Sequence, residues 1–590
     1  MTHWTLIDTF FERTEGPMKD RVYVRARPVR GKPFSDTTFA QFGEKVRDIF
    51  AGFASLGVER GDRIAIVSES RPEWMIGEFA AMALGAIWVP MFPTLTPQQI
   101  SFIVNDCGAK LLLVSNDLQL GKALKIFTNC PSLRAIVLLS VETKLTTPAD
   151  IRIVPFQKLT RIAGSAPDFN SEAQKAREDD TIAIVYTSGT TGNPKGVMLS
   201  HRNIRANVDG ALAAIPSLDE NDSALSFLPL CHTFEHIANQ FFFFRAMSVA
   251  FAESADTVAE DLLEVRPTVM TGVPRFFERI YGRIMRMRDK LPTPRRKVFD
   301  WALAVGMKNG KRFEGESVAL LSRAMLPIAD ALVLKKIRAR TGGRVRFFVS
   351  GAAALPADVG RAFAAFGLPI LEGYGLTEAS PVLCANHVEK MKWGTVGPPL
   401  DNLELKIAED GEILARGPNI MQGYYGQPEA TREMIDRDGW LHTGDVGQFD
   451  SEGFLKITDR KKHLFVSTGG KNIAPAPIEA LLTESPYIDQ AVLLGDKQPF
   501  CTALIVPDRE ALREAEISGT KEIHVLIQKE IDRLLSALAS YERVRRFIIL
   551  DEAFTVENGM MTPTLKIRRK AVEEHYRELI EGMYRIKEAV

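Results

Sequence analysis

The sequence predicts an α/β fold, with a large N-terminal domain of βαβ-type sheets and a small β-unit, followed by a small α+β C-terminal domain. Three observations carry this prediction. From residue 62 onward, short runs of Val, Ile and Leu alternate with helical patterns. At 404–415, two short apolar runs flank an acidic turn. Beyond 459–462 the pattern changes to a short helix, two strands and a long charged helix.

The alternating pattern predicts strands and helices in a regular order. Residues 63–67 are typical of a strand, 72–84 of a helix, and 86–90 of a second strand. Two further apolar runs, 110–114 and 134–139, continue the series. Strands that alternate with helices in this way favour mostly parallel sheets covered by helices.

The second half of the chain predicts two smaller units. Residues 404–407 and 411–415, with Gly411 ending the turn between them, predict an antiparallel hairpin. Past the boundary we expect four elements, a helix, two strands and a long helix, at 476–482, 490–494, 502–506 and 521–538. These suffice for a domain of their own. We therefore expect an N-terminal domain at 1–459 and a C-terminal domain at 460–590.

Composition excludes several classes of protein. The 590 residues are 45% hydrophobic and 25% charged, as in an ordinary globular protein. Lys plus Arg and Asp plus Glu both number 74, so no basic excess indicates nucleic acid. The five cysteines are scattered and predict reduced thiols. We expect a cytoplasmic protein without a signal peptide, and without a membrane-spanning helix because polar residues interrupt the apolar stretch 237–252.

The loop 186–196 is the strongest indication of chemistry. It follows the strand-like run 181–185, and glycines there let backbone amides approach a phosphate. Hydroxyls add donors and one lysine adds charge, so the loop predicts a polyphosphate site. The expected binding residues are Thr187, Ser188, Gly189, Thr190, Thr191, Gly192 and Lys195. The spacing fits neither G-x-x-x-x-G-K-[ST] nor G-x-G-x-x-G.

Two further strings carry candidate ligands. Residues 371–378 follow a strand-like run, and there Glu378 is a candidate Mg²⁺ ligand and Thr377 a phosphate donor. In the same string Tyr374, next to Gly375, offers a flat face for a purine. Residues 439–446 contain Asp445, whose carboxylate could accept both hydroxyls of a ribose. Taken alone, each string also fits a plain turn.

Together these strings resemble motifs of the AMP-forming acyl-CoA synthetases, a family that includes luciferases and peptide-synthetase adenylation domains. The loop 186–196 resembles the family's phosphate-binding loop, 374–378 its Y-G-x-T-E motif, and 440–445 its W-x-x-T-G-D motif. Residues 561–569 resemble its terminal lysine motif, in which the matching residue is Lys566 and Leu565 replaces a common glycine. The resemblance covers roughly residues 40 to 570, in the family's order.

The resemblance implies further site residues. Gly351 and Ala352 fall in a loop like the family's adenine-side loop, where Ala352 replaces a glycine. His232 matches a histidine that lines the carboxylate site, although a hydrogen-bonded core histidine is an open alternative. The remaining matches are a second ribose contact, the hinge of a mobile C-terminal domain and a loop beside the pantetheine tunnel, at Arg460, Lys462 and Gly470.

The implied reaction has two halves and uses ATP, Mg²⁺ and CoA. A carboxylate attacks the α-phosphate of ATP, and CoA then displaces AMP from the acyl-adenylate. Residues 262–281 are similar to a segment of long-chain fatty acyl-CoA synthetases, so we expect a medium- to long-chain fatty acid. Residues 241–244 could line an acyl tunnel or belong to the core. The alternatives are a fatty acyl-AMP ligase that loads a carrier protein and a non-catalytic nucleotide-binding homologue.

The segment 275–312 is the one locally charged region, with twelve basic residues against three acidic ones. Its apolar residues recur at roughly helical spacing, so it could contact anionic lipid. A solvated face on a helical pair is the alternative. The oligomeric state has no signature in the sequence.

Overall fold

The structure, a computed structural model, describes residues 5–28, 31–140, 143–161, 167–187, 194–254, 256–461, 465–466, 472–536, 538–562 and 567–585. The chain forms two compact units. The first comprises Met1–Leu405 and Ala415–Leu441, and the second comprises Lys406–Leu414 and His442–Val590. The sequence predicts a border between residues 459 and 460, where a mobile C-terminal domain should begin. That border stays a prediction.

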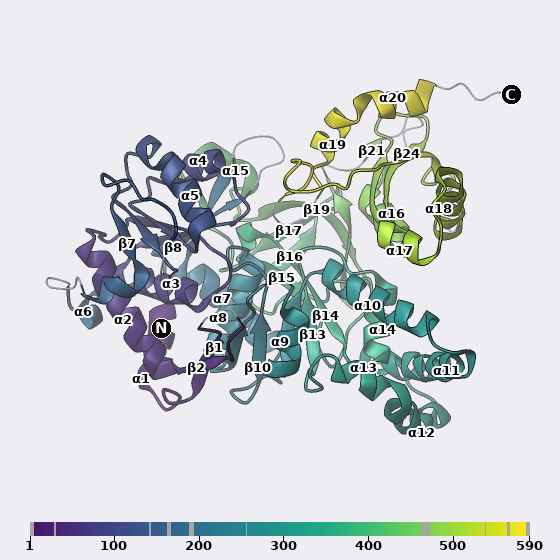
Figure 1. The fold of residues 1–590 in the computed structure, drawn as a ribbon, viewed down its shortest axis with the longest axis horizontal. Helices are drawn as coiled ribbons and strands as arrows, with labels where there is room; N and C mark the ends of the chain where they lie inside the picture. The colour runs from purple at the N-terminus through teal and green to yellow at the C-terminus, as the bar shows by residue number, and fades with distance from the viewer. Residues whose placement is uncertain are drawn as a thin grey trace. The chain divides into compact units, whose positions relative to one another are not determined.

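Two eight-stranded sheets form the framework of the first unit (Figure 1). In one, the order is β15 (Val382–Ala385), β14 (Ile370–Gly375), β13 (Phe347–Ser350), β12 (Val269–Gly272), β10 (Ser223–Ser226), β11 (Ser248–Phe251), β1 (Val22–Ala26) and β2 (Ser35–Thr38). In this sheet, only the pairings of the edge strands β15 and β2 are antiparallel.

The other large sheet has the order β18 (Gly423–Tyr424), β9 (Lys195–Ser200), β8 (Thr181–Thr187), β4 (Ile87–Met91), β3 (Arg63–Val67), β5 (Leu111–Val114), β6 (Ala135–Leu138) and β7 (Ile153–Pro155). Strands β8 to β7 in this order are parallel, whereas β9 and β18 are antiparallel to their neighbours. The interiors of the parallel strands are apolar and buried because helices cover both of their faces.

Helices separate and cover these sheets in an αβαβα arrangement. One core cluster joins facing sides of both sheets through α1 (Leu6–Glu15), α2 (Phe39–Ser55), α3 (Pro72–Leu84), α7 (His201–Ala214) and α8 (Thr233–Phe244). The outer face of the β8-containing sheet packs on α4 (Pro97–Cys107) and α5 (Asp117–Ile126). The outer face of the β14-containing sheet packs on α9 (Val258–Val265), α10 (Pro274–Asp289), α11 (Thr293–Gly310) and α14 (Ala357–Ala365).

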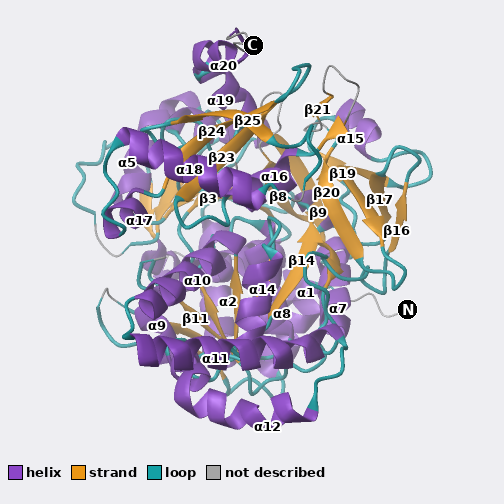
Figure 2. Cartoon of the chain, turned by 90° about the vertical axis from the view of Figure 1, so that its right-hand side faces the viewer, coloured by secondary structure: helices purple, strands orange, loops and turns teal. Residues whose placement is uncertain are grey.

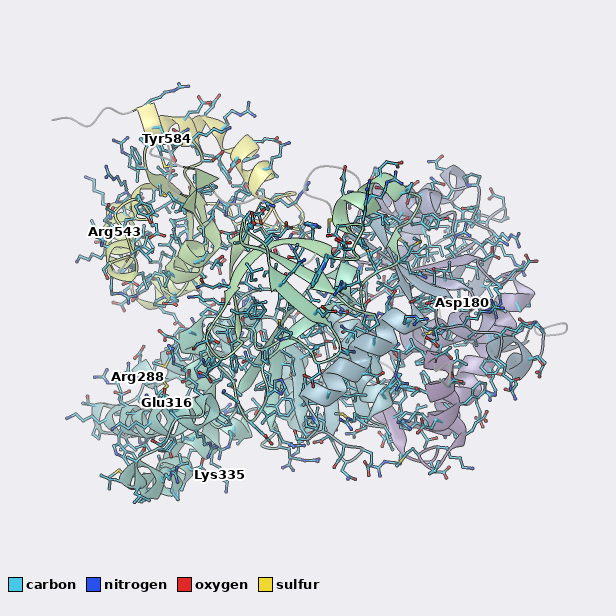
Figure 3. The ribbon with its side chains drawn as sticks, turned by 180° about the vertical axis from the view of Figure 1, so that it is seen from behind. Asp180, Arg288, Glu316, Lys335, Arg543 and Tyr584 are labelled. Carbon is cyan, nitrogen blue, oxygen red and sulfur yellow. The ribbon has the colours of Figure 1, made fainter. Side chains whose placement is uncertain are left out.

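Shorter helices complete the first unit. They are α6 (Phe169–Ala173), α12 (Leu320–Ala329), α13 (Lys335–Ala339) and α15 (Pro428–Met434). Helix α12 packs beside α11 at the edge of the unit, as Figure 2 shows. Figure 3 labels Arg288 and Lys335, from α10 and α13, in the same outer part of this unit.

The second unit combines β-sheets with helices. A four-stranded sheet, whose first three strands have residues in both units, has the order β16 (Glu404–Ile407), β17 (Glu412–Arg416), β19 (Leu441–Phe449) and β20 (Leu455–Arg460). Two smaller sheets follow, β21 (Phe465–Val466) with β22 (Asn472–Ile473), and β23 (Ile488–Leu494) with β24 (Cys501–Pro507) and β25 (Val544–Ile549). The helices are α16 (Pro475–Leu482), α17 (Arg509–Glu514), α18 (Thr520–Leu534), α19 (Arg569–His575) and α20 (Arg577–Arg585).

The predicted α/β class is confirmed, and most predicted elements agree with the structure within two residues. The strand at 63–67 and the helix at 72–84 have the predicted bounds. The helix predicted to reach residue 538 is wrong at its end, because α18 stops at Leu534. Residues 241–244 belong to α8 and are buried, and Phe243 lies 4.8 Å from Phe79 between ring centroids, so they are core.

Asn207 ties α7 to the turn between β14 and β15. Its side chain is fully buried, and Nδ2 donates to the carbonyl oxygen of Val382 at 2.7 Å. Its Oδ1 accepts from the amide of Val382 at 3.2 Å. The Asn207 side chain therefore bonds both backbone groups of Val382, as a neighbouring strand would, where β15 begins.

Replacing Asn207 with Ala should lower the free energy of unfolding by about 1–3 kcal/mol, because the amide of Val382 loses this acceptor and its carbonyl keeps the longer, 3.3 Å bond from Asn419. Urea denaturation of the full chain measures this. Asn105→Ala is the matched control, since that exposed side chain bonds one loop carbonyl. A loss from Asn207→Ala no larger than the control's would contradict the assignment.

Candidate active site

The described ends of the predicted phosphate loop lie on two strands that pair in antiparallel fashion. Thr187 ends β8, Lys195 begins β9, and the two residues are paired. Residues 188–193, including Ser188, Gly189, Thr190, Thr191 and Gly192, lie outside the described residues. Next to Lys195, a Cβ at Gly196 would lie 2.7 Å from a methyl carbon of Ile184, so the close pairing requires glycine. The hairpin thus brings Lys195 back beside Thr187.

A tyrosine links this hairpin to the predicted magnesium ligand. Tyr424 lies on β18, which pairs with β9, and its residue is only 5% exposed. The Lys195 ammonium lies 5.0 Å from the centroid of the Tyr424 ring, within the range of a cation–π contact. The Tyr424 hydroxyl donates to Oε1 of Glu378 at 2.9 Å. Lys195 and Glu378 are therefore positioned by one side chain.

The protonation of Tyr424 suits this role. Burial first, and then the charge of Glu378 and the hydrogen bond to it, raise the pKa of the Tyr424 hydroxyl well above its ordinary value. The hydroxyl therefore keeps its proton and acts as a donor. Glu378 is also held through its backbone, because its carbonyl oxygen accepts from the amide of Met421 at 2.9 Å.

The end of β14 presents the remaining residues of the predicted Y-G-x-T-E string. Tyr374 is half-buried on β14 and opposite Cys384 of β15. A Cβ at Gly375 would lie 1.7 Å from the carbonyl oxygen of Pro381, so this position admits glycine alone. Thr377 begins the short helical turn that carries Glu378, and its hydroxyl lies 3.3 Å from that of Thr233 on α8. The string is thus packed against the start of α8.

His232 caps that helix. Its Nδ1 accepts from the amide of Phe234 at 3.2 Å. The ring is half-buried, and the Phe92 ring lies 6.4 Å away between centroids. The hydrogen bond of His232 is therefore that of a half-buried helix cap. Its contact with a substrate carboxylate stays a prediction.

The loop after β13 packs against the start of α8. A Cβ at Gly351 would approach the Phe234 ring to 3.2 Å, so the loop and α8 are in close contact. Ala352 has φ +71°, in the left-handed region that favours glycine. The substitution of alanine for the family's glycine therefore keeps a glycine-like backbone, at a cost in strain of about 1–2 kcal/mol. Both residues lie where the resemblance implies, and their binding role stays a prediction.

Glu372 is a buried carboxyl group that the sequence analysis missed. It is 5% exposed on β14, and its Oε1 accepts from the amide of Leu355 at 2.9 Å. Burial raises its pKa to about 8, and the bond from Leu355 offsets part of this shift. The protonated group holds the loop containing Gly351 and Ala352 against β14. A glutamate within an apolar run was the only sequence signal.

The second unit brings together the two predicted ribose contacts. Asp445 on β19 and Arg460 on β20 are paired across the sheet, and Arg460 Nε donates to Asp445 Oδ1 at 2.8 Å. Asp445 is buried, whereas the Arg460 side chain is half-exposed. The preceding Gly444 has φ +70°, and its amide donates to Glu412 at 2.9 Å. This geometry orients the Asp445 carboxylate and leaves Arg460 accessible.

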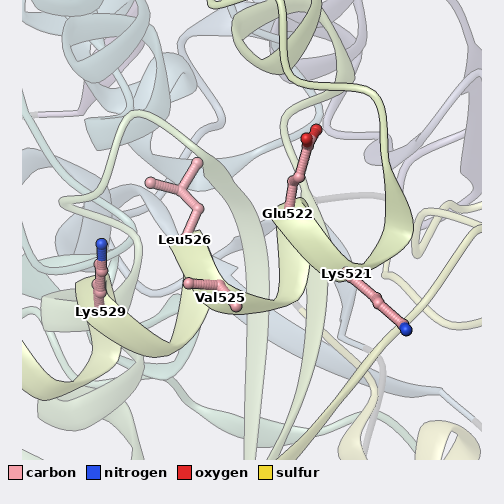
Figure 4. Close-up of a pocket in the computed structure, with 5 residues that line it drawn as sticks. All are labelled: Lys521, Glu522, Val525, Leu526 and Lys529. Carbon is pink, nitrogen blue, oxygen red and sulfur yellow. The ribbon is translucent and has the colours of Figure 1, made fainter.

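Several predicted residues cannot be placed. Lys462, Gly470 and Lys566 lie outside the described residues. A surface hollow of about 360 Å³ in the second unit lies elsewhere, along α18 (Figure 4). Its five lining residues all belong to that one helix, Lys521, Glu522, Val525, Leu526 and Lys529. It contains none of the predicted site residues.

The described residues contain no group of three or more His, Cys, Asp or Glu side chains that could hold a metal ion. Mg²⁺ on a nucleotide is usually held by one or two carboxylates together with phosphate oxygens and water. Among the described helices, none is long and apolar enough to cross a membrane.

Comparison with known proteins identifies the family of this chain. The chain belongs to the AMP-binding enzyme family: the family's model matches residues 10–425, and that of the AMP-binding enzyme C-terminal domain matches 462–588. It is 34% identical over 569 residues to the long-chain-fatty-acid–CoA ligase FadD15 of Mycobacterium bovis, covering 93% of this chain and 92% of that protein. It is 31% identical to the peroxisomal long chain acyl-CoA synthetase 6 of Arabidopsis thaliana, covering 93% and 81%.

Solved structures share the fold. The adenylation domain of a carboxylate reductase from Mycobacterium chelonae matches with a TM-score of 0.79 at 23% identity, over 99% of this chain and 92% of that one. An anthranilate CoA ligase in complex with anthranoyl-AMP matches with a TM-score of 0.75 at 21% identity, over 98% and 99%. The predicted family and fold are therefore confirmed.

Replacing Tyr424 with Phe should lower the rate of pyrophosphate release about 10- to 100-fold, since Glu378 loses one charge-assisted hydrogen bond of about 1.5–3 kcal/mol. The cation–π contact survives, so binding of ATP should change less than turnover. Tyr425→Phe is the matched control, because that neighbour contacts the hairpin through its backbone amide. Equal rates for both variants would contradict the role of the hydroxyl.

Replacing Glu372 with Gln should flatten the dependence of stability on pH. The folded-state pKa of about 8 exceeds the ordinary value of 4.5, so the stabilisation is complete below the lower value and lost as pH rises through the upper one. Gln keeps an acceptor for Leu355 and does not ionise. Chemical denaturation from about pH 5 to about pH 9 should show wild type losing more stability than the variant. Parallel curves would show that Glu372 does not titrate in this range.

Proposed function

We propose that this chain is an ATP-dependent long-chain fatty acid–CoA ligase that forms an acyl-adenylate and then an acyl-CoA. The observation that carries the proposal is the joint placement of Lys195 and Glu378 by Tyr424, beside Thr377. Support also comes from the relatives, which are named long-chain fatty acid–CoA ligases and match over nine-tenths of this chain.

In the first half-reaction, an oxygen of the fatty acid carboxylate attacks the α-phosphorus of ATP. The bond from that phosphorus to the bridging oxygen breaks, and pyrophosphate leaves. The hairpin tip around Lys195 holds the β- and γ-phosphates, and Thr377 donates to a phosphate oxygen. Lys566 of the C-terminal domain, at 460–590, stabilises negative charge at the α-phosphate. His232 lines the carboxylate side.

The nucleoside is held by two groups of residues. Tyr374, Gly375, Gly351 and Ala352 contact the adenine, and Asp445 with Arg460 contacts the ribose. The paired carboxylate and guanidinium support this assignment, because they present an acceptor and a donor side by side. The hydrogen bond that the Leu355 amide donates to the Glu372 side chain keeps the adenine-side loop in place.

Mg²⁺ completes the proposed site. Glu378 is the carboxylate that would hold it, and Tyr424 fixes the orientation of that carboxylate. When bound, the cation supplies neutralising charge at the phosphates.

In the second half-reaction, the CoA sulfur attacks the acyl carbon, the acyl–phosphate bond breaks, and AMP leaves. The C-terminal domain turns about Lys462, which withdraws Lys566 and brings the loop with Gly470 to the pantetheine. This rotation of the C-terminal domain is part of the proposed mechanism.

Activity against a panel of acids tests the proposal. With ATP and CoA present, palmitate and oleate should give AMP and acyl-CoA, whereas acetate and benzoate should give little. Glu378→Gln should lower AMP release about 100-fold, by analogy with the loss of one preorganised electrostatic contact. Glu59→Gln, at an exposed position in the same unit, is the control.

Other outcomes would identify the alternatives. Adenylate formation without thioester formation would indicate a fatty acyl-AMP ligase that loads a carrier protein. Absence of pyrophosphate release with every acid would indicate a non-catalytic nucleotide-binding homologue. A preference for acetate or benzoate would contradict the long-chain assignment.

A further inference from the structure

Exposed apolar side chains gather in one part of the first unit. Thirteen large hydrophobic residues are exposed among the described residues, and seven of them lie between 287 and 332. The most exposed is Leu320, at 83%. It is joined on α12 and the following turn by Leu321, Ile328 and Leu332. Such a concentration of exposed apolar residues marks an interaction surface.

The exposed residues of α12 form one face of the helix. Leu320, Ala324 and Ile328 follow one another at four-residue spacing, and all are exposed. On the opposite face, Ser322 and Ala329 are buried. Helix α12 is held to α11 there, since Nδ2 of Asn309 donates to the hydroxyl of Ser322 at 2.9 Å. The apolar face is thus fixed outward by the packing beneath it.

Basic residues surround this face. Between residues 275 and 340 the chain has seventeen Lys and Arg against six Asp and Glu, in a protein whose total net charge is zero. Lys335 and Lys336 follow Leu332 by one helical turn, and Lys335 is labelled in Figure 3. Four exposed basic residues near the face form no ion pair with a described residue, namely Arg323, Lys335, Lys336 and Arg340.

The charged segment predicted from the sequence is partly neutralised. On α10, Arg288 is paired with Asp300 at 2.7 Å and with Asp289 at 2.7 Å. Exposed apolar residues are denser just beyond that segment, at 320–332, where exposed basic residues also lie.

We propose that α12 and the turn to Lys336 form a docking face for an anionic lipid bilayer. Leu320, Leu321 and Ile328 enter the interfacial region, and Lys335 and Lys336 contact the lipid phosphates beside them. An apolar face bordered by basic residues is the pattern of a helix that lies in a membrane interface. A second copy of this chain is a poorer occupant, because it would bring another basic surface against this one. The inference does not depend on the ligase activity.

Flotation with lipid vesicles tests this surface on the full chain. Wild type should bind phosphatidylcholine vesicles that contain phosphatidylglycerol, and bind vesicles of phosphatidylcholine alone more weakly. The triple variant Leu320→Ser, Leu321→Ser, Ile328→Ser should lower the partition coefficient at least about tenfold. Lys335→Glu with Lys336→Glu should give a similar loss on the anionic vesicles only.

Leu118→Ser is the matched control, because Leu118 is a 67% exposed leucine on α5. It should leave vesicle binding unchanged. Activity with a dispersed acid and no vesicles should be the same in every variant, which shows that each is folded.

Three outcomes would overturn the proposal: wild type that does not bind anionic vesicles, a triple variant that binds as wild type does, or a control variant that loses as much. Analytical ultracentrifugation tests whether a second copy of this chain occupies the face instead. A dimer that the triple variant dissociates, with vesicle binding unchanged, would assign the face to a second copy of this chain.

Discussion

The hydrogen bond from Tyr424 to Glu378 is the interaction on which the arrangement of the first unit's site depends. Glu378 belongs to the turn after β14, whereas Tyr424 belongs to an edge strand of the other large sheet. The two sheets are separated by a layer of helices, and the amide of Met421, three residues before Tyr424, also donates to the carbonyl oxygen of Glu378. The proposed phosphate-binding hairpin and the proposed cation-binding carboxylate can act together only if such contacts set their spacing.

Buried polar groups repeat this principle at neighbouring positions. Asn207 ties α7 to the β14–β15 turn, and Glu372 ties the loop after β13 to β14. Each of these side chains takes the place of backbone pairing where strands end. Burying them is costly unless each has a partner, and the partners are backbone groups of the loops that must be held. The loops around the site are therefore ordered by a few buried side chains from the rigid layers.

The elements of this fold were predictable where the local pattern was strong. Strand β3 and helix α3 have the predicted bounds because buried apolar runs and a Pro–Gly bracket define them locally. The end of α18 was not, since leucine and alanine residues that suit a helix continue past Leu534, to Leu538. Glu378 and Asp445 stood in recognisable strings. Tyr424 did not, because its role arises from the pairing of β18 with β9, more than 220 residues apart in sequence. The interpretation of 241–244 was settled by packing against α2 and α3, which no local pattern reveals.

The zero net charge of this chain conceals a separation of charge. Outside residues 275–340, acidic residues exceed basic ones by eleven, which balances the excess within that segment. A protein of this kind has no net drift in an electric field near its isoelectric point of about 7.1, yet it experiences a torque. Close to any charged surface, this torque acts before contact and falls away within a Debye length of about 8 Å at physiological ionic strength. Ionic strength would then control how the molecule is turned on arrival, separately from how firmly it is held.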